Sequence, residues 1–102
     1  MSDDYTITRD EGTVTLTAGA LSHLVATAAE TVDGARVRRP RRGLDVAVDG
    51  GKARVELELA VRYGEVLPDV AAEVQRRVDG ALREIAGLET ASVDVSVEEL
   101  DG

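Results

Sequence analysis

The chain has 102 residues, the size of one small domain. Twelve Lys and Arg against twenty Asp and Glu give a net charge of −8, which disfavours a dedicated binder of DNA or RNA. The absence of cysteine excludes disulfides, thiolate metal sites and cysteine nucleophiles. The N-terminus has no apolar signal-peptide core and no stretch approaches roughly 18 apolar residues, so we expect a cytoplasmic protein without direct membrane insertion.

The first ten residues are acidic and contain few apolar side chains apart from Tyr5 and Ile7. Burial of so little apolar surface would not offset the entropy lost on ordering the backbone. This composition predicts a flexible acidic tail at residues 1–10, followed by a single domain at residues 11–100.

Strand and helix patterns alternate along this domain. Alternating β-branched residues indicate strands, and apolar residues at helical spacing indicate two helices, the first with Thr17 as its N-cap. Predicted strands cover residues 13–16, 35–38, 44–48, 54–63 and 93–97, and predicted helices cover residues 18–32 and 67–85. The predicted order is therefore β-α-β-β-β-α-β.

Each predicted helix has one apolar stripe, and the two long strands are apolar on one side only. Both helices should then cover the same face of one sheet. We expect a two-layer α+β fold in which two helices pack on one face of a mixed, mostly antiparallel sheet.

The single histidine, His23, is the only side chain that ordinarily titrates near neutral pH. Its helical position is about 160° from the apolar stripe, so it should face water. No nucleophile or metal-ligand cluster accompanies it, and we expect neither catalysis nor a cofactor.

The outward face of the predicted sheet is mainly acidic. It would carry Asp45, Glu56, Glu58, Asp94 and Glu98 against Arg54 and Arg62. Paired carboxylates can perform acid–base chemistry or hold a hard cation, but an open, solvated face is not built to tune them for catalysis. The face also lacks the aromatic side chains on which RNA bases stack. Its ordinary interpretation is a charged, hydrated surface.

An arginine-rich segment interrupts this acidic chain. It contains Arg36, Arg38, Arg39, Arg41 and Arg42 around Pro40. Such a loop could contact phosphates, lipid headgroups or an acidic protein, or it could balance neighbouring acids within the chain. Among the binding roles we favour protein docking, because the acidic remainder of the chain opposes polyanions.

An ordered set of residues extends from Gly12 to Leu100. It comprises Gly12, Val14 and Leu16, the Ala-rich helix 21–29, Val32-Asp33-Gly34, Tyr63-Gly64, Leu67-Pro68, Val70-Ala71, Val74-Gln75, Val78, Gly87-Leu88 and the strand 93–97. This set resembles the alkaline shock protein family of bacterial envelope stress response proteins. Two positions depart from it: Ala35 stands where the family usually has valine, and Asp94 where it often has asparagine.

The resemblance implies a non-enzymatic cytoplasmic protein that gathers beneath the membrane through a membrane-anchored partner protein. The family has no established catalytic residue and implies no cofactor. The arginine-rich segment falls where the family is variable, so a role for it is not implied.

We therefore expect a protein-binding or scaffold module with two partner-binding surfaces. One is the Arg36–Arg42 loop, and the other is the acidic face around Glu56, Glu58 and Asp94. We expect these oppositely charged surfaces to lie on different parts of the domain, so they could join copies head to tail. The size of such assemblies in solution should then fall as the salt concentration rises. We expect no metal, no small-molecule substrate and no nucleic acid.

The alternative hypothesis is a nucleic-acid-associated module that uses the Arg36–Arg42 loop. Its signature would be a logarithmic salt slope of about −3 to −5 on polynucleotide, lost when the loop arginines are replaced.

Overall fold

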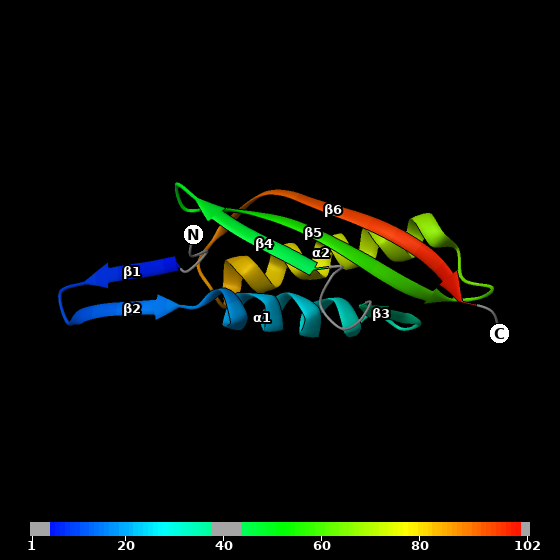
Figure 1. Cartoon of the computed structure of the whole chain (residues 1–102), viewed down its shortest axis with the longest axis horizontal. Coiled ribbons are helices and arrows are strands. Elements are labelled where there is room, and N and C mark those ends of the chain that lie inside the picture. The colour runs from blue at the N-terminus through cyan, green and yellow to red at the C-terminus, as the bar shows by residue number, and fades with distance from the viewer. Residues whose placement is uncertain (1–4, 38–43, 101–102) are drawn as a thin grey trace.

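The computed structural model describes residues 5–37 and 44–100 of the chain (Figure 1). The elements are β1 Tyr5–Arg9, β2 Gly12–Leu16, α1 Ala18–Glu30, β3 Ala35–Val37, β4 Leu44–Asp49, β5 Lys52–Arg62, α2 Leu67–Glu84 and β6 Glu89–Leu100. The predicted order is present from β2 onward, with one additional strand before it.

Strand β5 is the centre of the main sheet. β6 runs parallel to β5 along one edge, with its pairing extending from Lys52↔Glu89 to Arg62↔Leu100. β4 and β3 run antiparallel along the other edge, where β4 pairs with residues 52–57 and β3 with residues 59–61. β3 and β4 therefore lie end to end beside β5, and the sheet is mixed and mostly antiparallel, as predicted.

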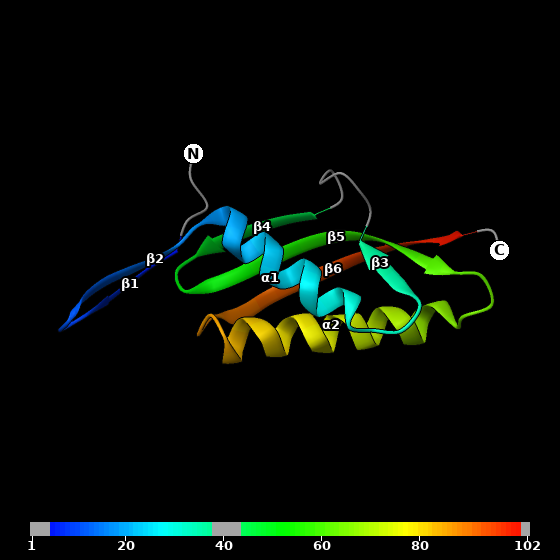
Figure 2. The same ribbon diagram turned by 90° about the horizontal axis from the view of Figure 1, so that it is seen from below.

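Both helices cover the same face of this sheet (Figures 1 and 2). α1 contacts β3 and β4, whereas α2 contacts mainly β6, and the two helices contact each other. Alternate side chains of β5 point into the space between the layers, because successive residues of a strand face opposite sides. Among the described residues, the largest fully buried side chains are Leu21, Val25, Val55, Leu57, Leu59, Val61, Val74, Val78, Leu82 and Leu88. This arrangement confirms the two-layer α+β fold.

Local signals in the sequence explain how the helices begin and end. The Thr17 side chain accepts a hydrogen bond from the backbone N–H of Ala20 at 3.1 Å, which confirms the predicted N-cap of α1. α2 begins with Pro68 in its first turn, where a missing N–H costs no helical hydrogen bond. After α2, Gly87 has a φ of 69° and reverses the chain, and the Leu88 N–H donates back to the Leu82 carbonyl at 2.9 Å.

The turn between α1 and β3 requires glycine at position 34. Gly34 has a φ of 85°, and a Cβ at this position would lie 3.2 Å from Nη2 of Arg62 and 3.3 Å from Glu65. The backbone N–H of Arg62 also donates to the Gly34 carbonyl at 3.0 Å. This close approach ties the end of β5 to the start of β3.

The prediction of a flexible tail at residues 1–10 is wrong for β1. Tyr5–Arg9 pairs antiparallel with β2 from Tyr5↔Leu16 to Arg9↔Gly12, and the two strands form a separate sheet. The physical reason is local: each strand has three consecutive β-branched residues, and a two-residue connection closes the hairpin. Residues 1–4 lie outside the described residues.

Two boundaries also differ from the prediction. α1 ends at Glu30, earlier than the predicted residue 32, because the Thr31 and Val32 N–H groups bond to the Ala28 and Ala29 carbonyls in a tightened last turn. β6 is longer than residues 93–97 and spans Glu89–Leu100, because it pairs with the whole length of β5.

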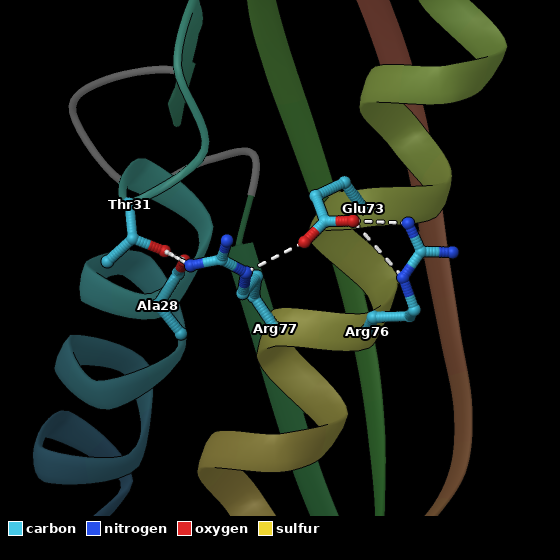
Figure 3. A network of polar contacts seen from close by, with 5 residues as sticks. All are labelled: Ala28, Thr31, Glu73, Arg76 and Arg77. Atoms are coloured by element: carbon cyan, nitrogen blue, oxygen red, sulfur yellow. Dashed lines mark hydrogen bonds and ion pairs between the residues drawn. The ribbon is translucent and has the colours of Figure 1, made fainter.

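A polar network joins the two helices at the surface (Figure 3). Glu73 and Arg77 are four residues apart on α2 and form an ion pair, with Nε to Oε2 at 2.8 Å, and Arg76 also contacts Glu73. Nη1 of Arg77 lies 3.4 Å from the hydroxyl of Thr31, the C-cap residue of α1, and that hydroxyl donates to the Ala28 carbonyl at 2.6 Å. Glu73 therefore orients a guanidinium that bridges α2 to α1.

This network predicts a pH-dependent contribution to stability. Hydrogen bonds from Arg76, and then from Arg77, hold the pKa of Glu73 below its ordinary value of 4.5. A lowered pKa stabilises the folded protein above the unfolded pKa, and that stabilisation is lost as the pH falls below about 4.5 toward the folded value. We expect the stability difference between the native chain and a Glu73→Gln variant to shrink over this range in urea titrations. Parallel pH profiles of the two proteins would contradict the expectation.

Candidate functional site

The outer face of the main sheet, opposite the helices, carries a row of three carboxylates. Asp45 of β4 lies directly across from Glu56 of β5, and Glu56 lies directly across from Asp94 of β6. All three residues are exposed. Like charges at directly opposed positions destabilise a sheet by about 0.2–1 kcal/mol per pair. This acidic row, Asp45, Glu56 and Asp94, is therefore a local cost to the fold.

An open depression surrounds the acidic row. It has a volume of about 330 Å³ and is lined by Leu44, Asp45, Glu56, Leu57, Glu58, Asp94 and Ser96. Glu58 stands in the next row of β5, with Ser96 of β6 as its partner across the sheet. The structure thus brings Glu56, Glu58 and Asp94 together, whereas the sequence pattern predicted only their common face.

The basic residues predicted for this face do not neutralise the acidic row. Arg62 turns to the end of β5, where its Nη2 lies 3.1 Å from Asp33 and 3.3 Å from Glu65. Arg54 belongs to an adjacent row, between Ala47 and Ser92. Within residues 5–37 and 44–100, no ion pair joins the acidic row or Glu58 to a base.

Arg36 lies on the same outer face as these acids. Its side chain is exposed, and in the sheet it stands in one row with Ala60 of β5 and Glu98 of β6. Ala60 is two and four residues from Glu58 and Glu56, so this row is on the same face of the sheet as those acids. The expectation that the arginines and the acidic face occupy different parts of the domain is therefore wrong for Arg36, because β3 and β4 share one edge of β5. Arg38, Arg39, Arg41 and Arg42 lie outside the described residues.

Val37 and Leu44, the described residues on either side of residues 38–43, attach beside Glu58. Val37 pairs with Leu59 and Leu44 pairs with Leu57, so Glu58 lies between the two attachment points on β5. Val37 and Leu44 are thus fixed at the border of the acidic depression.

Glu30 fixes the first of these attachment points. Its Oε2 accepts a hydrogen bond from the partly buried backbone N–H of Val37 at 3.0 Å. This contact joins the last turn of α1 to the edge of β3. The sequence offered no signal for it, because the two residues are seven positions apart on either side of a turn.

Replacing Glu30 by alanine is expected to lower the free energy of unfolding by about 1 kcal/mol, the usual net value of one hydrogen bond. Amide hydrogen exchange at Val37 should accelerate, because its N–H loses the acceptor. Glu30→Gln, which keeps an acceptor oxygen at the same reach, is the control and should retain most of the protection. Equal exchange at Val37 in the native chain and in Glu30→Ala would contradict the assignment.

The opposite edge of the sheet receives a matching contact from the other helix. Nε2 of Gln75 in α2 donates to the backbone carbonyl of Val93 in β6 at 2.9 Å. Each helix therefore uses one polar side chain to occupy a backbone group of an edge strand, which protects that edge from pairing with another chain.

Other candidate residues do not add to this site. His23 is exposed on α1, in the layer on the far side of the sheet from the acidic row. In the part of the chain that the structure describes, no three His, Asp or Glu side chains are grouped to hold a metal ion. No helix among the described residues is long and apolar enough to cross a membrane.

Comparisons with known proteins agree with this description. A model of the alkaline shock protein family, described as having a cell envelope-related function, matches residues 35–101 and confirms the resemblance noted in the sequence. No curated protein sequence matches the chain. Among solved structures, a histidine-to-alanine variant of the MamM CTD is 22% identical with a TM-score of 0.57, covering 81% of this chain and 98% of that chain. The cadmium form of another MamM CTD variant is 25% identical with the same TM-score, covering 81% and 96%. These structures show a shared fold.

Proposed function

Because the chain belongs to the alkaline shock protein family, whose function is related to the cell envelope, we propose that it is a non-enzymatic scaffold module that binds partner proteins. The binding surface is the outer face of the sheet around the acidic row and Glu58. The partner offers a basic segment and is anchored in the membrane, which brings this protein to the inner surface of the envelope.

The acidic row is the observation that supports this proposal. Asp45, Glu56 and Asp94 stand directly opposite one another, although alternating charges would stabilise the sheet better. They surround an open depression of about 330 Å³ and have no ion-pair partner among the described residues. A basic peptide laid across the three strands would relieve their mutual repulsion and gain favourable charge contacts.

The net charge of the chain supports attachment through a protein rather than directly to lipid. The cytoplasmic leaflet of a membrane is negatively charged and attracts basic segments. A chain with a net charge of −8 is repelled by that surface on average. A membrane protein with a basic cytoplasmic segment would supply both the anchor and the complementary charge.

The test is affinity capture by the full tagged chain from nuclease-treated host lysate, with membrane and cytosolic fractions analysed separately. The informative bait carries Glu56→Gln and Asp94→Asn, which remove two charges from the acidic row. The matched control carries Glu84→Gln and Glu89→Gln, which remove the same charge from exposed positions outside the row.

We expect one membrane protein with a basic cytoplasmic segment to be recovered with the native and control baits and lost with the acidic-row bait. Equal recovery by all three baits would contradict the proposed surface. Recovery of nucleic acid from the cytosol in the absence of nuclease would favour the nucleic-acid-associated alternative. The head-to-tail assembly expected from the sequence stays a prediction.

A further inference from the structure

The arm, defined as β1 and β2, projects from the two-layer body along the long axis of the molecule (Figures 1 and 2). The molecule measures 52 × 23 × 18 Å. The two faces of the arm differ: one carries threonines, including the opposed pair Thr6 and Thr15, and the other carries the apolar pair Ile7 and Val14. Val14 is 52% exposed, so the chain itself leaves part of this apolar face uncovered.

A two-stranded sheet of this kind is marginally stable in water when it stands alone. Three or more strands with an apolar face are ordinarily needed for an independent sheet. In the described residues, β1 and β2 pair only with each other. The arm therefore gains stability from any strand added to one of its edges.

The edges of the main sheet, in contrast, are protected against such pairing. β4 carries Asp45 and Asp49, and β6 carries several acidic residues along its length. Glu30 binds the edge of β3, and Gln75 binds the edge of β6. Charged residues and covering side chains are the devices by which natural sheets prevent association of their edges.

β2 has none of these devices. Its sequence, Gly12-Thr13-Val14-Thr15-Leu16, contains no charge and no proline, and Thr13, Val14 and Thr15 are β-branched. β1 differs because it ends in the charged Arg9. On a chain with a net charge of −8, β2 is an uncharged strand at which two copies can approach without placing like charges together.

We propose that two copies of this chain pair through their β2 strands, antiparallel and centred on Val14, to form a four-stranded sheet. Val14 then lies opposite the partner copy's Val14, and Thr13 lies opposite the partner copy's Thr15. The contact is two-fold symmetric and closes as a dimer, because the same strand is used by both copies. The inference does not rest on the acidic row.

The projection of the arm suits this dimer. The two acidic bodies lie at opposite ends of the paired arms, which limits their mutual repulsion. Added salt screens that repulsion further, so the dimer should hold or tighten as salt rises. Head-to-tail pairing of arginines with acids would instead weaken, so the salt response separates the two modes of association.

Single cysteines test the register directly, because the native chain contains no cysteine. Directly opposed residues of antiparallel strands have Cβ atoms about 4.5–5.5 Å apart, close enough for a disulfide after small adjustments. Val14→Cys is therefore expected to form a disulfide-linked dimer under mild oxidation. Ile7→Cys is the matched control on the same face: the two copies would be three strand spacings apart, about 14 Å, and should stay unlinked.

Charge substitutions provide a second test, measured by sedimentation equilibrium. Val14→Asp and Val14→Lys should each weaken self-association by about 100-fold, because like charges would meet at the two-fold axis. An equimolar mixture of the two variants should recover a dimer that contains one copy of each, which shows that neither variant fails merely by misfolding.

Three outcomes would overturn this inference: a native chain that remains monomeric at millimolar concentration in both low and high salt, linkage through Ile7→Cys in place of Val14→Cys, or no recovery in the mixture. Capture of the membrane partner by the Val14→Asp variant would be unaffected in each case. Failure of the dimer is thus distinguishable from failure of the proposed function.

Discussion

Replacing Leu59 by alanine is expected to lower the free energy of unfolding by about 2–5 kcal/mol, a large part of the roughly 5–15 kcal/mol that stabilises a domain of this size. Leu59 is fully buried in the central strand, where it pairs with Val37 of β3 and Val97 of β6. Truncation leaves a cavity between the sheet and the helices. Urea titration should show a lower midpoint with an unchanged m-value.

The matched control is Ile85→Ala. Ile85 is also a large aliphatic residue, but it is 72% exposed after the end of α2. Its truncation should change stability by no more than about 0.5 kcal/mol, as is usual for surface positions. Similar losses for Leu59→Ala and Ile85→Ala would contradict the assignment of Leu59 to the core.

The regular parts of the fold could be predicted because their periodicity is local. The alternation of apolar and polar residues along Lys52–Arg62 indicates one buried and one solvent-exposed face of the strand. The apolar stripe of α2 indicates which face of the helix packs against the sheet. The Glu73–Arg77 and Asp79–Arg83 pairs follow from helical spacing alone, and both are present. Each of these features depends on residues that are near in sequence.

Strand order could not be predicted in the same way, because it depends on contacts between distant segments. β3 and β4 occupy one edge of β5 end to end, which places Val37 and Leu44 on either side of Glu58. No local pattern reports that arrangement. The prediction of separate acidic and basic surfaces failed for Arg36 for this reason.

The arm could not be predicted from apolar density, because residues 5–9 contain only two apolar side chains, Tyr5 and Ile7. Exposed and half-buried residues alternate at the start of Tyr5–Arg9, as expected for a strand, but only two of its five partners, Val14 and Leu16, have large aliphatic side chains. Pairing with β2 supplies hydrogen bonds that a count of apolar residues does not register. The turn between Arg9 and Gly12 was the available signal.

The sequence predicts that the acids of the candidate site share one face of the sheet, but it does not predict that three of them stand directly opposite one another. Alternation placed Glu56, Glu58 and Asp94 on the outer side of the sheet. Their alignment depends on the β5–β6 register, which shifts between Ala53 and Arg54. A slip of one residue would turn the β6 side chains to the other face, so the row exists only because Val93, Val95 and Val97 pack inward and fix that register.

Neutralising the acidic row is expected to change stability and binding in opposite directions. In the double variant Glu56→Gln, Asp94→Asn, the repulsion between neighbouring carboxylates is removed, which should raise the free energy of unfolding by about 0.5–1 kcal/mol. The same variant should bind a nonaarginine peptide about 10-fold more weakly, because each lost charge contact is worth up to about 1 kcal/mol. Fluorescence anisotropy at low salt measures the affinity, and urea titration measures the stability.

The control variant Glu84→Gln, Glu89→Gln has the same net charge but leaves the row intact. If binding follows the row, the control keeps nearly the native affinity, whereas equal weakening in both variants would mean that the peptide responds only to total charge. A gain in stability with no loss of binding would also contradict the proposal. The acidic row lowers the stability of the fold, so a role in binding explains its presence. That explanation holds only if removing these carboxylates also weakens binding of the basic peptide.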